Sequence, residues 1–378
     1  MRNIIQIISC LLLLIFINSC TQDNYIIEEE EEGVTNPENN NVKGFYLLNE
    51  GNMGSNSATI DFMDFSLGVY RKNIYATANP TMVKELGDVG NDIKVYGNKL
   101  YAVINVSNFI EVMDLKTAKH IGTIPLENGR YITFANGKAY ASSYAGPVSI
   151  DPKAPLGKVV EIDTLSLSVT REVTVGYQPE ELEVIGNKLF VANSGGYKAP
   201  NYDNTISVVD LSTFKETEKI EVGINLHRLK KDSQGDLYVT SRGDYRDVPS
   251  NLYVINSQTY QIKKTFNLPV SNFTIDDDKL YYYSNEFNYN TSQSTKSYGI
   301  INTNTEEIIN NKLINDAELN NIRTPYGIAV HPNTKDIFLT DVGDYVSMGF
   351  VYCFDKNGMF KWKTTTGNIP AHFAFVYK

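Results

Sequence analysis

The stretch DIKVYGNKLYAVINVSNFIEVMDLKTAKHIGTI, residues 92–124, shows the pattern that decides the fold. Two short apolar runs flank a tight Gly97-Asn98 turn, and two more runs follow, separated by a turn that opens at Asp114. Glycine and asparagine favour the left-handed backbone of a hairpin turn, and an aspartate side chain starts a turn by bonding the backbone two residues on. The stretch therefore predicts four short antiparallel strands.

The same unit recurs about every 40 to 57 residues along the chain. Each third strand ends at a residue that opens a turn: Asp114, Asp163, Asp210, Asn256, Asn302 and Asp355. Four short strands repeated at this period are typical of a β-propeller blade. Six full units run from about 92 to 367, and the unit at 44–75 lacks its first strand.

The alternating segment His372–Lys378 is the natural candidate for that missing strand. If it completes the first unit, the ring closes and no sheet edge is left free to aggregate. We therefore predict an all-β, seven-bladed β-propeller of four-stranded antiparallel blades, with the first blade closed by the C-terminal strand.

The N-terminal residues predict export and lipidation. Arg2 precedes the apolar run Ile4–Ile17, which is short for a membrane span and typical of a secretory signal peptide. The run ends in Asn18-Ser19-Cys20, which resembles a bacterial lipoprotein box. We expect a signal peptide at 1–19 and a lipid on Cys20; an ordinary secreted protein or an uncleaved anchor are the alternatives.

Composition separates a tether from the propeller. Residues 20–42 contain the acidic run Glu28–Glu32 and few apolar groups, which favours a flexible segment, and the propeller is expected at 43–378. The chain has 34 basic and 44 acidic residues, of which Arg2 and seven acids precede residue 43, so the propeller carries a net charge of about −4. A propeller with a slight negative charge is a poor partner for nucleic acid. The chain has three cysteines, too few for a framework of disulfide bonds.

No catalytic or metal-binding motif stands out. None of the four histidines has metal-ligand spacing, and patterns for zinc proteases, nucleophile elbows and P-loops are absent. Asp232–Asp236 favours a plain turn over a calcium loop, and Asp341 and Asp344 have no nucleophile nearby. The single tryptophan, Trp362, argues against a quinone-cofactor propeller with its repeated tryptophans. We expect no enzyme activity, catalytic residue, metal or cofactor.

The long loops between second and third strands carry the strongest functional signal. They open on one face and are rich in tyrosine, which suits a binding surface. Tyr197, Tyr245 and Tyr345 each follow a glycine by two residues, at equal distances from the start of their second strands. The candidate ligand-binding residues are Tyr144, Tyr197, Tyr202, Tyr245, Phe287, Tyr289, Tyr345, Met348, His227 and Arg228. The alternative is that the repeated tyrosines bond between blades, and that His227 packs at a junction.

Three segments carry a family resemblance: Leu48–Asn52 (LNEGN), Tyr326–Pro332 (YGIAVHP) and Gly349–Tyr352 through Ile369-Pro370. Over residues 44–378 the chain resembles Bacteroidetes surface lipoproteins with YncE-like, YVTN-repeat propellers. The resemblance to the BtuG-type members implies a lipid-anchored outer-membrane protein at the cell surface. It would bind cobalamin or another corrinoid and deliver it to a TonB-dependent transporter, although no family binding residue transfers by position.

Two other functions remain open at this stage. The rim could dock a transporter or another surface protein, or the propeller could be a hydrolase or lyase whose site has no recognisable motif. A cavity lined by tyrosine and asparagine would favour the nutrient-binding function, a flat apolar rim would favour protein docking, and clustered carboxylates at a metal would favour the enzyme.

Overall fold

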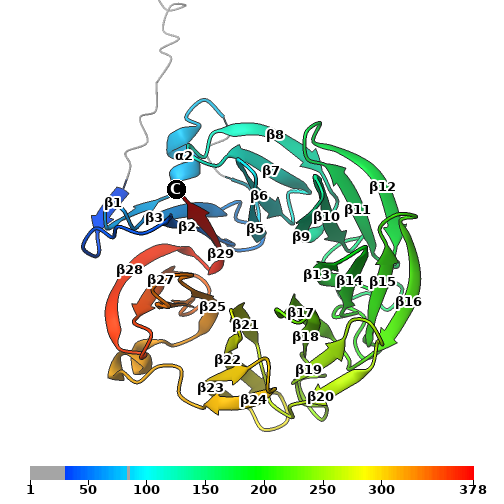
Figure 1. Cartoon of the computed structure of the whole chain (residues 1–378). Coiled ribbons are helices and arrows are strands. Elements are labelled where there is room, and N and C mark those ends of the chain that lie inside the picture. The colour runs from blue at the N-terminus through cyan, green and yellow to red at the C-terminus, as the bar shows by residue number, and fades with distance from the viewer. Residues whose placement is uncertain (1–29, 83–85) are drawn as a thin grey trace, which may run out of the picture.

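Seven β-sheets surround a central axis in the computed structural model, which describes residues 30–82 and 86–378 (Figure 1). Within these residues six sheets have four strands and one has five, and every strand pairs antiparallel with its neighbours. The predicted seven-bladed propeller is confirmed. The predicted signal peptide and Cys20 lie outside the described residues.

Each blade runs from an inner strand at the axis to an outer strand at the periphery, and the inner strands contact one another in a ring. From the first blade to the seventh the inner strands are β29 (Pro370–Tyr377), β5 (Gly90–Tyr96), β9 (Gly129–Ala135), β13 (Pro179–Ile185), β17 (Leu226–Lys231), β21 (Asn272–Asp276) and β25 (Pro325–Val330). The second strands are β2 (Val42–Asn49), β6 (Lys99–Ile104), β10 (Lys138–Ser143), β14 (Lys188–Asn193), β18 (Asp236–Ser241), β22 (Lys279–Asn288) and β26 (Ile337–Asp341).

The two outer layers follow the same order around the ring. The third strands are β3 (Thr59–Asp64), β7 (Phe109–Asp114), β11 (Lys158–Asp163), β15 (Thr205–Asp210), β19 (Asn251–Asn256), β23 (Gln293–Asn302) and β27 (Met348–Phe354). The outer strands are β4 (Val69–Lys72), β8 (His120–Pro125), β12 (Ser168–Thr174), β16 (Lys215–Glu221), β20 (Ile262–Thr265), β24 (Glu307–Asn310) and β28 (Phe360–Asn368). In the part of the chain that the structure describes, two short helices interrupt the pattern, α2 (Ile74–Ala78) and the 3-10 turn η1 (Ala317–Asn321).

The first blade closes as the sequence predicts. Strand β29 pairs with β2 from Val42↔Tyr377 to Asn49↔Pro370 and forms the inner edge of the sheet. An aromatic cluster seals the junction with the seventh blade, where the ring of Phe45 lies 5.0 Å from that of Phe338 and 5.2 Å from that of Phe373. Tyr377 is 56% exposed because it lies at the end of β29.

The prediction of a flexible tether over 20–42 is wrong for the described part of that segment. Residues Glu30–Gly33 form β1, which pairs with β4 and adds a fifth strand to the first sheet. The acidic run faces a basic strand: Glu31 Oε2 lies 3.3 Å from Arg71 Nε, and Glu30 Oε2 lies 3.4 Å from Lys72 Nζ. Cross-strand pairs of opposite charge stabilise such an edge, so 30–42 belong to the propeller.

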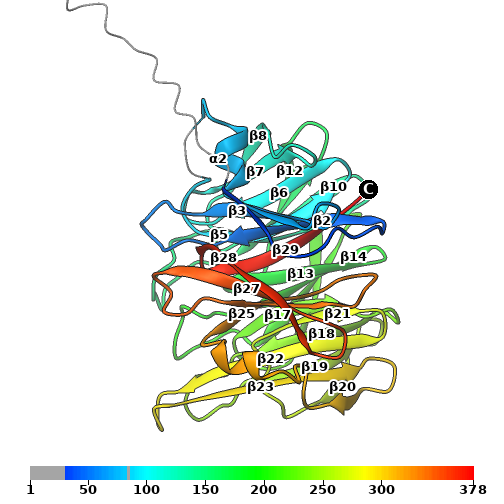
Figure 2. The same ribbon diagram turned by 90° about the vertical axis from the view of Figure 1, so that its left-hand side faces the viewer.

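The loops between second and third strands share one face of the ring. The segment Ser284–Ser297, expected to be a loop, instead continues β22 and β23 as a hairpin paired out to Asn288↔Gln293. Seen edge-on, this hairpin protrudes on the side where β29 begins, away from the C-terminus (Figure 2). No helix in the described residues is long and apolar enough to cross a membrane.

Candidate ligand-binding site

A cavity of about 1350 Å³ opens on the face that carries the long loops. Its floor comes from the first residues of inner strands and its wall from the loops between second and third strands, so that all seven blades contribute. Pockets for drug-sized ligands measure about 300–1,000 Å³. The cavity is therefore large enough for a bulky ligand.

The Gly-x-Tyr loops bring aromatic rings to the wall of the cavity. Tyr245 and Tyr345 adopt left-handed backbone, with φ of 62° and 65°, and each is just under half exposed. Their loops are tightened by Asp244 and Asp344, whose carboxylates accept hydrogen bonds from backbone N–H groups two and three residues ahead. Left-handed backbone is uncommon for tyrosine. The hydrogen bonds of the two aspartates fix this conformation and keep both rings at the mouth of the cavity.

Neighbouring rings pack edge to face along the wall. Tyr345 lies 6.0 Å from Tyr326, and Tyr144 lies 6.1 Å from Tyr197. Such pairs restrict the motion of the rings before any ligand binds, which lowers the entropic cost of binding.

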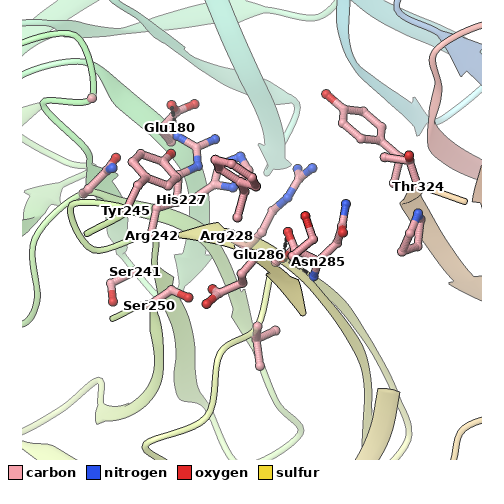
Figure 3. Close-up of a pocket in the computed structure, with 18 of the residues that line it drawn as sticks. Glu180, His227, Arg228, Ser241, Arg242, Tyr245, Ser250, Asn285, Glu286 and Thr324 are labelled. Atoms are coloured by element: carbon pink, nitrogen blue, oxygen red, sulfur yellow. Dashed lines mark hydrogen bonds and ion pairs between the residues drawn. The ribbon is translucent and has the colours of Figure 1, made fainter. Parts of the chain in front are cut away.

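A buried ion-pair cluster forms one side of the floor (Figure 3). Glu180 on β13 is fully buried, and its Oε2 accepts from Arg130 Nη2 at 3.1 Å and Nε at 3.2 Å. Its Oε1 accepts from Tyr144 Oη at 2.7 Å and from Arg242 Nη1 at 3.4 Å. Burial opposes ionisation of Glu180, but the two guanidinium groups and the tyrosine outweigh it and hold its pKa below the usual value.

A second cluster lies beside it, built from β9 and β17. Tyr131 Oη lies 2.9 Å from His227 Nε2 and accepts a hydrogen bond from Arg228 Nη1 at 3.0 Å. Burial, together with Arg242, Arg228 and Arg130, holds the pKa of His227 well below its usual value. A neutral His227 then accepts the hydroxyl proton of Tyr131, whose pKa burial raises.

A third cluster joins the first and seventh blades. Glu50 accepts from Tyr326 Oη at 3.0 Å, and its other oxygen lies 3.0 Å from His372 Nε2. The floor therefore consists of charged and hydroxyl groups that mostly bond one another.

The structure places eight of the ten sequence candidates at the cavity. They are Tyr144, Tyr197, Tyr245, Phe287, Tyr289, Tyr345, His227 and Arg228. Tyr202 is not among the residues that line the cavity. Met348 is half exposed and borders a small separate groove with Thr366 and Gly367.

Most residues of the floor lack the repeated residue type that marks the tyrosines of the wall. Glu50, Arg130, Tyr131, Glu180, Arg242 and Tyr326 all line the cavity. A positional signal was present, since Arg130, Glu180, His227 and Tyr326 are each the second residue of an inner strand. Their side chains point to the axis because they share that register.

The acidic residues considered for metals or catalysis serve the backbone. Asp232 accepts from the N–H groups of Gln234 and Asp236, which confirms a plain turn. Asp341 accepts from the N–H groups of Arg323, Thr324 and Gly343. In the residues that the structure describes, no group of three or more His, Cys, Asp or Glu side chains is arranged to hold a metal ion.

Comparison with known proteins identifies a family model and several similar structures. The model described as "Domain of unknown function (DUF5074)" matches residues 43–375. Among curated proteins there is no match. Solved structures share the fold at low identity and differ widely in function.

A quinoprotein alcohol dehydrogenase-like protein from Bacteroides thetaiotaomicron has a TM-score of 0.58 at 14% identity, covering 89% of this chain and 79% of that one. Kuenenia stuttgartiensis hydrazine synthase has a TM-score of 0.56 at 15% identity, over 71% and 76%. The dihydro-haem d1 dehydrogenase NirN has a TM-score of 0.53 at 11% identity, over 90% and 77%. At these identities the likeness concerns the fold alone.

Proposed function

The chain belongs to the DUF5074 family, and from that premise we propose that its propeller binds a bulky small-molecule ligand in the cavity at the mouth of the ring. The observation that carries the proposal is the cavity of about 1350 Å³, which residues from all seven blades line and into which aromatic and charged side chains from six of them converge. A large concave site with a few convergent polar groups is the usual form of a ligand site.

Within this function we propose cobalamin or another corrinoid as the ligand. A corrinoid is broad and carries both apolar edges and amide groups, so a wide site with tyrosine rings on its wall and hydrogen-bonding groups on its floor would suit it. The proposal includes lipid anchoring through Cys20 in the outer membrane, exposure at the cell surface and delivery to a TonB-dependent transporter. The leader sequence and the family resemblance support that part.

We propose binding without catalysis. The carboxylates Glu50 and Glu180 are held by hydrogen bonds and ion pairs from neighbouring side chains, and the pKa of Glu180 lies below the range of a general acid. Both are therefore suited to shaping a site and poorly suited to moving protons. A hydrolase or lyase would need a nucleophile or base that these contacts leave available.

Exposed apolar side chains around the mouth favour a second function, docking of a partner protein. Met53 and Tyr289 line the cavity and are 62% and 63% exposed, and Val346 next to Tyr345 is 70% exposed. Exposed apolar patches often mark protein interfaces. The two functions are compatible if the partner is a transporter that receives the ligand from the same face.

Calorimetry on the purified protein in detergent tests the proposal, with cobalamin, a corrinoid lacking the nucleotide, and haem as ligands. Tyr245→Ala and Tyr345→Ala should each weaken binding about thirtyfold, since removing an aromatic anchor costs about 2 kcal/mol. Tyr377→Ala, at an exposed tyrosine on the opposite face, is the control and should leave affinity unchanged. If no corrinoid binds, the corrinoid assignment is wrong; if both rim variants bind as wild type, the cavity is not the site.

A further inference from the structure

Arg228 is the least compensated charge in the cavity floor. The residue is 7% exposed and lines the cavity (Figure 3). Its one hydrogen bond runs from Nη1 to Tyr131 Oη, and its buried Nε has no acceptor among the described residues. A guanidinium has five N–H donors, so most of its hydrogen-bonding capacity remains for a partner in the cavity.

Other arginines show what a satisfied guanidinium looks like in this fold. Arg130 directs Nε and Nη2 onto Glu180, and Arg171 on β12 directs the same two nitrogens onto Glu161. Within residues 30–82 and 86–378, no carboxylate lies within ion-pairing distance of Arg228. In Arg130 and Arg171 the Nε and Nη2 atoms donate to a carboxylate, whereas in Arg228 these two atoms face no carboxylate within the described residues.

Neither Glu181 nor Glu286 forms an ion pair with Arg228 among the described residues. Glu181 accepts from Lys230 Nζ at 2.6 Å and from the Leu229 N–H at 2.9 Å. Glu286 also lines the cavity, and burial raises its pKa, which disfavours its ionised form. Arg228 is compensated by Glu181 only at a distance and by the face of Tyr131, 5.2 Å from its guanidinium carbon.

The whole floor has an excess of positive charge. Three guanidinium groups, those of Arg130, Arg228 and Arg242, share the floor with two carboxylates, Glu50 and Glu180. Glu50 accepts from Tyr326 and lies against His372. His227 is neutral and adds no charge. A positively charged floor in a protein of net negative charge produces a positive electrostatic potential in the cavity, which attracts anions.

We propose that the floor of the cavity is an oxyanion-binding subsite, in which Arg228 and Arg242 bind a carboxylate or phosphate group of the ligand. The Asn285 side chain also lines the cavity and makes no hydrogen bond within the described residues, so its amide is a further donor. A planar guanidinium matches both oxyanions in geometry, and bonds between ionised partners are the stronger ones. The inference rests on the proposed function and narrows its ligand to an anion-bearing molecule.

The subsite has consequences that can be measured before any ligand is known. Sodium phosphate and sodium acetate, each compared with sodium chloride at equal ionic strength, should raise the melting temperature of the purified protein, because a ligand that binds only the folded state stabilises it. The two anions separate phosphate from carboxylate recognition. Arg228→Gln should weaken the apparent affinity about tenfold or more, and Arg228→Lys should recover part of it.

Arg171→Gln is the matched control, because it removes a guanidinium far from the cavity and should leave the anion response unchanged. A structural role for Arg228 predicts that Arg228→Gln melts lower in the absence of anions. The subsite predicts no such loss, because the variant removes a buried charge that no carboxylate pairs with directly. A lower melting temperature together with an unchanged anion response overturns the proposal.

The outcomes also separate this inference from the proposed function. If a bulky ligand binds in a manner that depends on Tyr245, and neither anion stabilises the protein, the subsite is wrong and the ligand site stands. If the anions stabilise the protein through Arg228 but no corrinoid binds, the subsite stands and the corrinoid is replaced by another anionic ligand.

Discussion

Replacing Glu180 by glutamine removes the one carboxylate that neutralises Arg130 and Arg242 in the cavity floor. Glutamine keeps the size of the side chain and a carbonyl oxygen for the Tyr144 hydroxyl, but it leaves two guanidinium groups without their ion pair. Removing one partner of a buried pair costs about 3–5 kcal/mol. The Arg242 contact is long, at 3.4 Å, and partly exposed, so we expect about 3 kcal/mol here, at the lower end of that range.

Urea unfolding followed by linear extrapolation measures this loss. The matched control is Glu172→Gln on β12, where the carboxylate pairs with Lys158 at 2.9 Å and is 63% exposed. Exposed pairs are worth about 0–1 kcal/mol, so the control should stay close to wild type. Equal losses in the two variants would refute the argument that the floor cluster stabilises the propeller.

The same pair of proteins gives a pH dependence with a definite sign. The pKa of Glu180 in the folded protein lies below its unfolded value of about 4.3. Its contribution to stability is therefore fully present above that unfolded value and is lost as the pH falls through the folded pKa. The difference in unfolding free energy between wild type and Glu180→Gln should be constant near neutrality and shrink in acid; a difference that does not change with pH contradicts the ion pair.

Three further outcomes are expected. Truncation after Pro370 removes most of β29 and should give aggregated or protease-labile protein. Each large apolar side chain that is buried contributes about 1.5–3 kcal/mol to stability. A soluble product with an unchanged melting temperature rules out ring closure by this strand. Gly243→Ala places a Cβ against the Val248 carbonyl oxygen and should weaken ligand binding, measured by calorimetry. Gly97→Ala is the control: Gly97 also has a positive φ, but the space around its Cβ is open, so binding should change little. Cys20→Ala should move the protein from the membrane to the soluble fraction, and sedimentation with membranes after a salt wash would show that the anchor lies elsewhere.

The blade pattern could be predicted from the sequence because its signals are local. Asp114 and its equivalents bond backbone groups two or three residues ahead, and Gly97 adopts the left-handed backbone that its turn requires. Such signals repeat in every blade and lie within a few residues of each other. The closing strand β29 followed from counting strands, since one unit lacked its first strand.

The edge strand β1 escaped prediction because its partners are distant. The run at 30–33 looks like a solvated charged segment until Arg71 and Lys72, about 40 residues away, are placed opposite it. A rule based on composition has no access to that pairing. The same limit applies to the hairpin of β22 and β23, whose polar residues gave no strand signal beyond Ser284.

The floor of the site was missed for a different reason. Its residues share a register on the inner strands but differ in type: an arginine on β9, a glutamate on β13, a histidine on β17 and a tyrosine on β25. A search for repeated residue types therefore found the wall tyrosines and passed over the floor. A search by position within the repeat would have selected Arg130 and Glu180.

The closure of the first blade has a consequence for the order of events during synthesis. Strand β29 follows every other described strand in the chain, yet its partner β2 is the second strand made, so the two are joined only after the intervening six blades have been translated. Contacts between residues so far apart form late. Until then β2 presents an unpaired edge that other chains could join, and a nascent chain stalled before residue 370 would be an open arc exposed to chaperones and proteases.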